Sequence, residues 1–221
     1  MTFRYSRLLC LVILIGLVAS LMINVRRHEV EQRNMTVDFA IDYLRELSGT
    51  LTFPPTDEEF FGALPDFRFA SGVGGWSTSL VFSPDGSAEL SFHDSDMGDT
   101  GDGYPNGTVY VCDCRYVFGE LKRENAYVWS ARILERDPDG PEVGEEWIED
   151  GVRYVQSVPY GLENADRVYF YLPGAPTAEL TSDFLLWLSM PRAWGGEYPL
   201  TLPCWGLYSP NDETGFSGGE A

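Results

Sequence analysis

The chain of 221 residues contains 34 Asp and Glu against 15 Lys and Arg, which gives a formal net charge of −19 at pH 7. Such a surface repels nucleic acid and anionic lipid, so we expect neither as a ligand. Aromatic residues make up 14% of the sequence, which is enough for a folded core and argues against a disordered stalk. The length that follows the apolar N-terminal region is typical of one domain.

An uncharged run of 18 residues extends from Leu8 to Val25, with arginines on both sides. As a helix that rises about 1.5 Å per residue it would be roughly 27 Å long, close to the ~30 Å hydrocarbon core of a bilayer. A cleaved signal peptide and a buried core helix are the alternatives, but the apolar run continues past the small residues 18–20 that would form a cut site. We therefore predict an uncleaved anchor over residues 1–28, a single pass through the cell membrane and an extracytoplasmic C-terminal part.

Residues 29–66 are predicted to form a juxtamembrane helical segment and a linker. Apolar side chains recur at near-helical spacing over residues 29–47, and a Ser-Gly pair ends this pattern. A Pro-Pro pair then breaks the chain. Thr56, followed by three acidic residues, is typical of the start of a second, short helix.

From Phe67 the hydrophobic period changes to two, which predicts β-strands. Pro-Asp-Gly at residues 84–86 is turn chemistry between two alternating segments, so we predict a hairpin there. The inward face of its first strand consists of Trp76, Thr78, Leu80 and Phe82. Further strands are predicted over residues 108–118 and 126–134, in a hairpin over residues 147–155, and around residues 168–172.

The remaining segments complete one antiparallel domain over residues 67–208. We interpret residues 136–146 as an exposed loop, residues 181–190 as a capped short helix, and residues 209–221 as a flexible tail. Gly74-Gly75-Trp76 resembles the Gly-x-Trp start of lipocalin-like barrels. The predicted fold is therefore mainly β, an antiparallel meander closed as a lipocalin-like (calycin-type) barrel, with an N-terminal transmembrane helix and short flanking helices.

The polar loop HDSDMGDTGDGYPN gathers Asp94, Asp96, Asp99 and Asp102, and hard divalent cations prefer several oxygen ligands of this kind. The EF-hand pattern fails, because Gly98 occupies its fifth position. We interpret the loop as a turn-rich hairpin connection whose aspartates cap backbone amides. The four aspartates are the candidate ligands if the loop binds a calcium-type ion, and no cofactor is predicted.

The enzymatic motifs HExxH, P-loop and GxGxxG are missing from the sequence. His93 is the only histidine distal to the membrane-proximal His28, and we interpret it as a surface residue of the hairpin. A non-catalytic protein is therefore favoured. An exported hydrolase that uses the carboxylates between Asp94 and Asp102 is the alternative.

Several motifs are specific enough to compare with known families. They are GGWST (74–78), PDG (84–86), HDSDMGDTGDGYPNGTVY (93–110), DGVRY (150–154) and LPGAP (172–176). Together they resemble a family of exported, membrane-anchored proteins of Gram-positive bacteria. That family has no established activity, so the resemblance implies a cellular location and a type of domain, but no reaction.

Three cysteines follow the predicted anchor. Cys112 and Cys114 share one face of a strand, at a spacing close to the upper limit for a disulfide, so Cys204 is the natural partner for one of them. An oxidising exterior permits such a bridge. Cys114 and Cys204 both depart from the apolar or aromatic positions of the family pattern, and the resemblance therefore implies a Cys114–Cys204 disulfide.

Three functions follow from these features. The leading hypothesis is a non-catalytic, membrane-anchored extracytoplasmic barrel that binds a small ligand or an envelope protein partner. Its interior would be lined by Trp76, Tyr110, Tyr127 and Trp129, although small barrels are often filled by their own side chains. The alternatives are the hydrolase and a structural accessory of an envelope complex that docks through the helix of residues 30–47.

Overall fold

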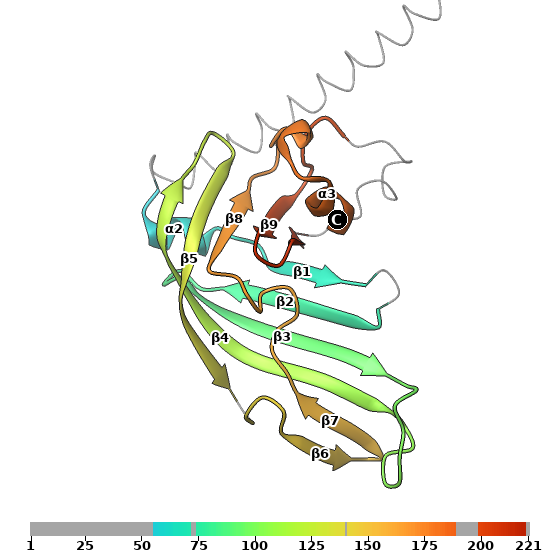
Figure 1. Ribbon diagram of the computed structural model, residues 1–221. Helices are drawn as coiled ribbons and strands as arrows, with labels where there is room; N and C mark the ends of the chain where they lie inside the picture. The colour runs from blue at the N-terminus through green and yellow to red at the C-terminus, as the bar shows by residue number, and fades with distance from the viewer. Residues whose placement is uncertain (1–54, 72–73, 140, 189–198, 220–221) are drawn as a thin grey trace, which may run out of the picture.

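A computed structural model describes residues 55–71, 74–139, 141–188 and 199–219 (Figure 1). The predicted anchor and the predicted helix over residues 29–47 lie outside these ranges. In the part that is described, no helix has the length and apolar character needed to cross a membrane. The described elements, in chain order, are α2 (Asp57–Gly62), β1 (Phe67–Ala70), β2 (Trp76–Phe82), β3 (Ser87–Asp96), β4 (Thr108–Arg123), β5 (Val128–Asp139), β6 (Glu146–Glu149), β7 (Val152–Gln156), β8 (Arg167–Tyr171), the 3-10 helix η1 (Thr177–Glu179), α3 (Ser182–Trp187), β9 (Trp205–Ser209) and β10 (Thr214–Gly218).

Eight strands form a closed antiparallel barrel in the order β1-β2-β3-β4-β5-β8-β9-β10. The last strand returns to the first, with Phe67 of β1 opposite Gly218 of β10. The β2–β3 hairpin has the predicted inward face, since Thr78 and Leu80 are fully buried. The prediction of a mainly β, antiparallel meander barrel is therefore confirmed.

Strands β6 and β7 form a hairpin that extends from the barrel wall (Figure 1). This is the hairpin predicted over residues 147–155. Its second strand, β7, runs parallel to the start of β4, with Arg153 opposite Thr108. The prediction of a loop over residues 136–146 is wrong at both ends, because β5 continues to Asp139 and β6 begins at Glu146. The far end of β5 pairs with β4, whose long edge would otherwise lack hydrogen-bond partners.

Helix α2 closes one end of the barrel. Its N-terminus is the helix start predicted at Thr56, and it forms a capping box: the Glu59 amide donates to Thr56 Oγ1 at 3.2 Å, and the Thr56 amide donates to Glu59 Oε2 at 2.9 Å. Phe60 and Phe61 point into the core, where both rings contact Phe170 at centroid distances of 5.6 and 6.4 Å. The cap thus aims two aromatic side chains into the barrel.

The connection between β7 and β8, residues 157–166, covers the other end (Figure 1). Two buried hydroxyls fix it to the barrel wall. Thr78 Oγ1 of β2 donates to the Tyr160 carbonyl oxygen at 2.7 Å, and Thr214 Oγ1 of β10 donates to the Gly161 carbonyl oxygen at 2.6 Å. Leu162 follows at once and is fully buried. We call residues 157–166 the crossing loop.

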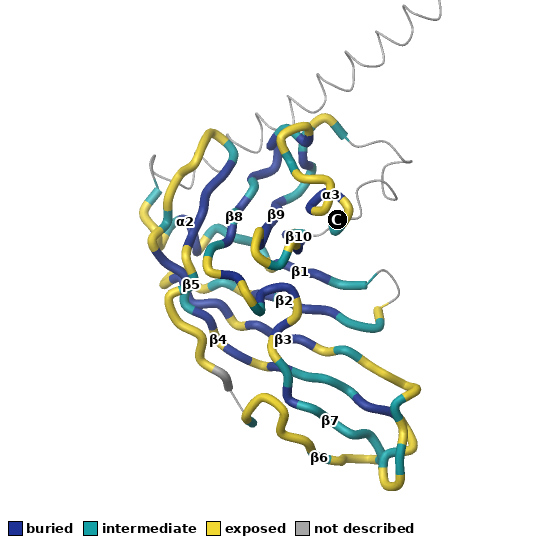
Figure 2. Tube along the Cα trace, in the orientation of Figure 1, coloured by how far each residue is buried: buried dark blue, intermediate teal, exposed yellow. Residues whose placement is uncertain are grey.

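The interior between α2 and the crossing loop is filled by the protein's own side chains, and Figure 2 shows the buried positions along the barrel strands. Trp129 is part of this core, whereas Trp76 and Tyr110 pack against it from positions that are only partly buried. Tyr127 packs against a second, smaller cluster around Phe184. The predicted ligand site inside the barrel is therefore occupied by packing.

The C-terminal segment differs from the flexible tail predicted for residues 209–221. Ser209 ends β9, and residues Thr214–Gly218 form β10, which closes the barrel and buries Phe216 completely. The glycines that conceal this strand in the sequence are required by packing. A Cβ on Gly215 would lie 2.4 Å from the ring of Phe184, which sits on this wall from α3.

Candidate functional site

The acidic loop places its aspartates in different environments. Asp96 Oδ1 accepts the amides of Gly98 at 2.9 Å and Asp99 at 3.2 Å, which confirms the predicted capping role for this residue. Asp99 forms an ion pair with Arg153, Asp102 is exposed, and Asp94 lies on β3. Within the described ranges, no group of three or more His, Cys, Asp or Glu is arranged to hold a metal ion.

Arg153 joins the two most specific motifs of the sequence. Its guanidinium pairs with Asp99, its Nε donates to Thr108 Oγ1 at 3.1 Å, and its Cζ lies 4.8 Å from the centre of the Tyr104 ring. Asn106 Nδ2 also donates to the Asp150 carbonyl oxygen at 3.0 Å. The motifs over residues 93–110 and 150–154 therefore meet in a structural junction that holds the β3–β4 loop against the β6–β7 hairpin.

His93 lies on the exposed side of β3, as predicted. Its Nδ1 is 3.2 Å from Ser77 Oγ, the cross-strand neighbour on β2. A nucleophile of the serine type also needs an acid that orients the imidazole. Among the residues that the structure describes, no carboxylate hydrogen-bonds to His93, so the Ser77–His93 pair lacks the orienting acid of a serine triad.

The three described cysteines form no disulfide. Cys114 hydrogen-bonds Cys112 and so lowers the pKa of the Cys112 thiol, although burial and Asp113 act in the opposite direction. Cys204 precedes β9, and burial raises the pKa of its thiol to about 11. The implied Cys114–Cys204 bridge is absent because β5 and β8 lie between β4 and β9. At about 4.8 Å per strand this separation exceeds the ~7 Å limit for bridged Cα atoms.

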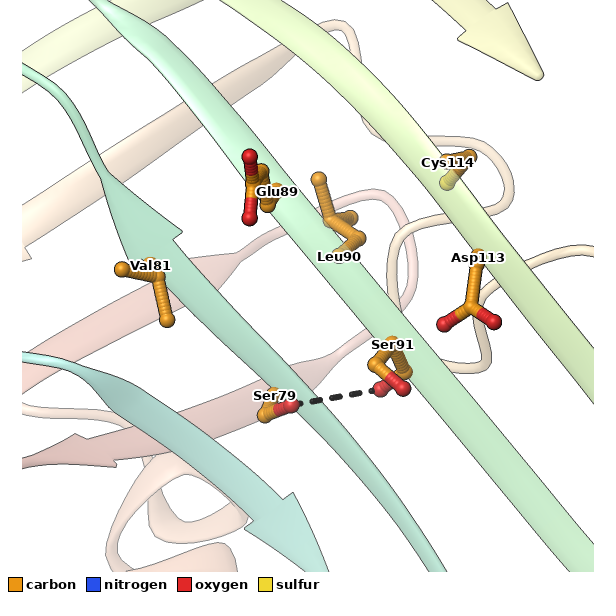
Figure 3. Close-up of a pocket in the computed structure, with 7 residues that line it drawn as sticks. All are labelled: Ser79, Val81, Glu89, Leu90, Ser91, Asp113 and Cys114. Atoms are coloured by element: carbon orange, nitrogen blue, oxygen red, sulfur yellow. Dashed lines mark hydrogen bonds between the residues drawn. The ribbon is translucent and has the colours of Figure 1, made fainter. Parts of the chain in front are cut away.

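One hollow, of about 410 Å³, lies on the outer side of the β2–β3–β4 wall (Figure 3). We call it the outer hollow. Its residues are Ser79, Val81, Glu89, Leu90, Ser91, Asp113 and Cys114. Ser79 Oγ donates to the Ser91 carbonyl oxygen at 3.4 Å, and the side chains are spread along three strands rather than convergent. None of its described residues supplies an aromatic ring to hold a ligand.

A second hollow, of about 400 Å³, lies between the β2–β3–β4 rim and the crossing loop. We call it the rim hollow. Four of its residues are aromatic, and the rings of Trp76 and Tyr160 meet edge to face with centroids 5.0 Å apart. It is lined by Trp76, Phe92, Asp94, Tyr110, Ser157, Val158, Tyr160 and Glu163.

Three polar groups of the rim hollow are available for a ligand. No other described residue hydrogen-bonds the Asp94 carboxylate, the Tyr110 phenol or the Trp76 indole N–H, and all three residues are partly buried. A partly buried polar group without a protein partner loses solvation that a ligand can restore. Glu163 differs, because its Oε2 accepts the Gly161 amide at 2.7 Å and so helps to hold the crossing loop.

A neighbouring hollow of about 520 Å³ shares Tyr160 and Glu163 with the rim hollow. Its polar groups are largely used by the fold. Asp212 accepts hydrogen bonds from Ser209 and Asn164, and Trp187 Nε1 donates to the Glu213 carbonyl oxygen at 3.0 Å. This leaves the rim hollow as the better candidate site.

The sequence identified only part of this site. Trp76 and Tyr110 were predicted to line a ligand site, and they do line a hollow, but at the rim rather than inside the barrel. Tyr160 and Glu163 were missed, since the crossing loop has no periodic pattern. The turn residues Pro159 and Gly161 on either side of Tyr160 were the available signal.

No family model, curated protein or solved structure matches this chain. The class of protein is therefore defined by the fold, a closed eight-stranded antiparallel barrel with both ends covered.

Proposed function

We propose that the protein is a non-catalytic, membrane-anchored extracytoplasmic binding protein whose recognition site is the rim hollow. The observation that carries the proposal is the convergence of Asp94, Tyr110 and Trp76 on one aromatic hollow, with their polar groups unused by the other described residues. A concave aromatic surface with a few convergent polar groups is typical of ligand sites.

The packed core supports a site at the rim. Phe60 and Phe61 fill one end, and Leu162 fills the other, so a ligand would have to displace buried side chains to enter the barrel. Displacing such side chains costs several kcal/mol each. The rim hollow accepts a group from solvent without that cost.

The proposed membrane localisation is based on the sequence. The uncharged run from Leu8 to Val25 supports a single-pass anchor, and the resemblance of several motifs to those of exported Gram-positive proteins supports an extracytoplasmic domain. The eight-stranded meander and the Gly-x-Trp start support a lipocalin-like fold, here with a packed interior and with the proposed recognition site at the rim.

Native mass spectrometry of the full-length protein, purified in detergent from its own host, tests this proposal. We expect a retained small molecule or partner that is lost from Tyr110→Ala and kept by His93→Ala, a matched change on the exposed side of the same wall. Retention that is equal in both variants would place the ligand elsewhere and overturn the proposal.

A further inference from the structure

We infer that the group bound in the rim hollow is an organic cation, a guanidinium or alkylammonium, held by the Asp94 carboxylate and the aromatic rings. This inference rests on the proposed function and names the ligand class for the same site. It follows from the charges that line the hollow, from the ring chemistry, and from a comparison within the chain itself.

The charges that line the hollow are of one sign. Asp94 and Glu163 are the charged residues among the described ones that line it, and within the described ranges neither Lys nor Arg lines it. The adjoining hollow adds Asp183, Asp212 and Glu213. Partial burial weakens solvent screening of the Asp94 charge, so an anion would be repelled and a cation attracted.

One cation contacts the back of the crossing loop. Arg136 of β5 donates to the carbonyl oxygens of Glu163 and Ala165, and its Cζ lies 5.1 Å from the centre of the Tyr116 ring. Its donors are thus directed at backbone carbonyls rather than at the Asp94 carboxylate, which it does not neutralise by contact.

The rings supply the second half of a cation site. A cation within about 6 Å of an aromatic face is attracted by the negative face of the ring, and more strongly when it is desolvated. Trp76, Phe92, Tyr110 and Tyr160 all line the hollow. A neutral saccharide could also stack on these rings, but it would gain nothing from the charge of Asp94.

A guanidinium bound between a carboxylate and an aromatic ring is present elsewhere in this chain. At the β3–β4 junction, the Arg153 guanidinium lies over the Tyr104 ring and pairs with the Asp99 carboxylate. The rim hollow presents the ring and the carboxylate, Tyr110 and Asp94, without the cation. We therefore expect an external guanidinium or ammonium to take the place that Arg153 occupies in the junction.

Isothermal titration of the full-length protein with agmatine, which has a guanidinium and an ammonium, tests the inference. We expect saturable binding that Asp94→Asn weakens about tenfold or more, because a charge-assisted contact is lost while the side-chain shape is kept. Asp113→Asn, which removes a carboxylate from the outer hollow, should leave the affinity unchanged. Tyr110→Ala should weaken binding without changing the unfolding midpoint by more than a few degrees, since Tyr110 is only partly buried.

Two controls separate the possible outcomes. Equal weakening by Asp94→Asn and Asp113→Asn would show general attraction to an acidic surface and overturn the inference. Glucose that binds through Tyr110 in preference to agmatine, with no effect of Asp94→Asn, would overturn the cation class but keep the rim site. No saturable binding of either probe, together with no retained molecule in native mass spectrometry, would overturn both. Tighter binding of an acetyl-Gly-Arg-Gly amide than of agmatine would identify the cation as a partner's side chain rather than a free amine.

Discussion

Thr214 of β10 and Gly161 of the crossing loop are joined by a buried hydrogen bond of 2.6 Å, donated by the threonine hydroxyl to the glycine carbonyl. The neighbouring carbonyl, that of Tyr160, accepts from Thr78 of β2 in the same way. Two strands of the barrel thus hold consecutive peptide groups of the crossing loop. The position of the Tyr160 ring in the rim hollow depends on these two hydroxyls.

Thr214→Val should destabilise the protein by about 1–3 kcal/mol, because the change keeps the shape but leaves the buried Gly161 carbonyl without its donor. Urea unfolding measures the loss. Ser217→Ala on the same strand removes an exposed hydroxyl with a long 3.4 Å contact and should cost less than about 0.5 kcal/mol. Equal effects of the two substitutions would contradict the role of Thr214.

Gly161→Ala should be clearly more destabilising than Gly144→Ala. Both glycines have positive φ, +94° and +90°, so alanine is strained by about 1–2 kcal/mol at either position. Only at Gly161 would the new Cβ also meet Phe69 at 2.9 Å and Phe216 at 3.2 Å, whereas Gly144 faces open space. Overpacking should add about 1–3 kcal/mol to the Gly161 variant in denaturant unfolding. A difference near zero would show that the core adapts around the loop.

Arg153→Met should release the β3–β4 loop, because methionine keeps part of the side-chain stem but loses the ion pair with Asp99 and the hydrogen bond to Thr108. Hydrogen exchange should become faster over residues 97–107, with a global cost of about 1 kcal/mol for a partly exposed pair. The control is Arg132→Met, whose pair with Glu120 is largely exposed and should leave exchange in that loop unchanged. Unaltered exchange in both variants would remove the junction as the cause of loop order.

Cys204 should make the free energy of unfolding fall between pH 9 and 11. Burial raises the pKa of its thiol from 9.0 to about 11, so in this range the native state keeps a proton that the unfolded state releases. Stability from this group is complete below pH 9 and is lost as pH approaches 11, with a slope of at most about 1.4 kcal/mol per pH unit. Cys204→Ala should flatten that part of the profile.

Tyr116 provides the reference for this pH series. Burial raises the pKa of its phenol to about 12, so it acts with the same sign above pH 10 and remains in the Cys204→Ala variant. The free energy of unfolding, measured with urea at pH 8, 9.5 and 11 in wild type and in Cys204→Ala, separates the contribution of the Cys204 thiol from that of the Tyr116 phenol. Identical slopes for wild type and Cys204→Ala would show that the thiol pKa is not raised by folding.

Local patterns in the sequence were sufficient for much of the fold. Alternation of apolar residues predicted the β2–β3 hairpin, because one face of a barrel strand must be buried and its period is two. The helix start at Thr56 was predicted for the same kind of reason, since the residues that cap a helix are neighbours in the sequence. Features that rest on contacts within a few residues are readable in this way.

Features that depend on distant contacts were missed. The glycines of β10 are typical of a flexible tail in the sequence, but Gly215 is needed because the Phe184 ring occupies the space where a Cβ would lie. The crossing loop has no pattern of its own, and its place is set by hydroxyls on β2 and β10. The Asp99–Arg153 pair and the separation of Cys114 from Cys204 likewise follow from which strands become neighbours, and the sequence does not show this locally.

Barrel closure has a consequence for how the chain must be made. The contact between Ser217 and the Arg68 carbonyl oxygen spans 149 residues, so β1 has no partner on one side until β10 has been synthesised. Contacts of this range slow folding, and an unpaired strand edge is a template for aggregation. A chain that ends before Thr214 would expose two strand edges without partners, on β1 and on β9. It would need a chaperone to cover these edges and prevent association with other chains.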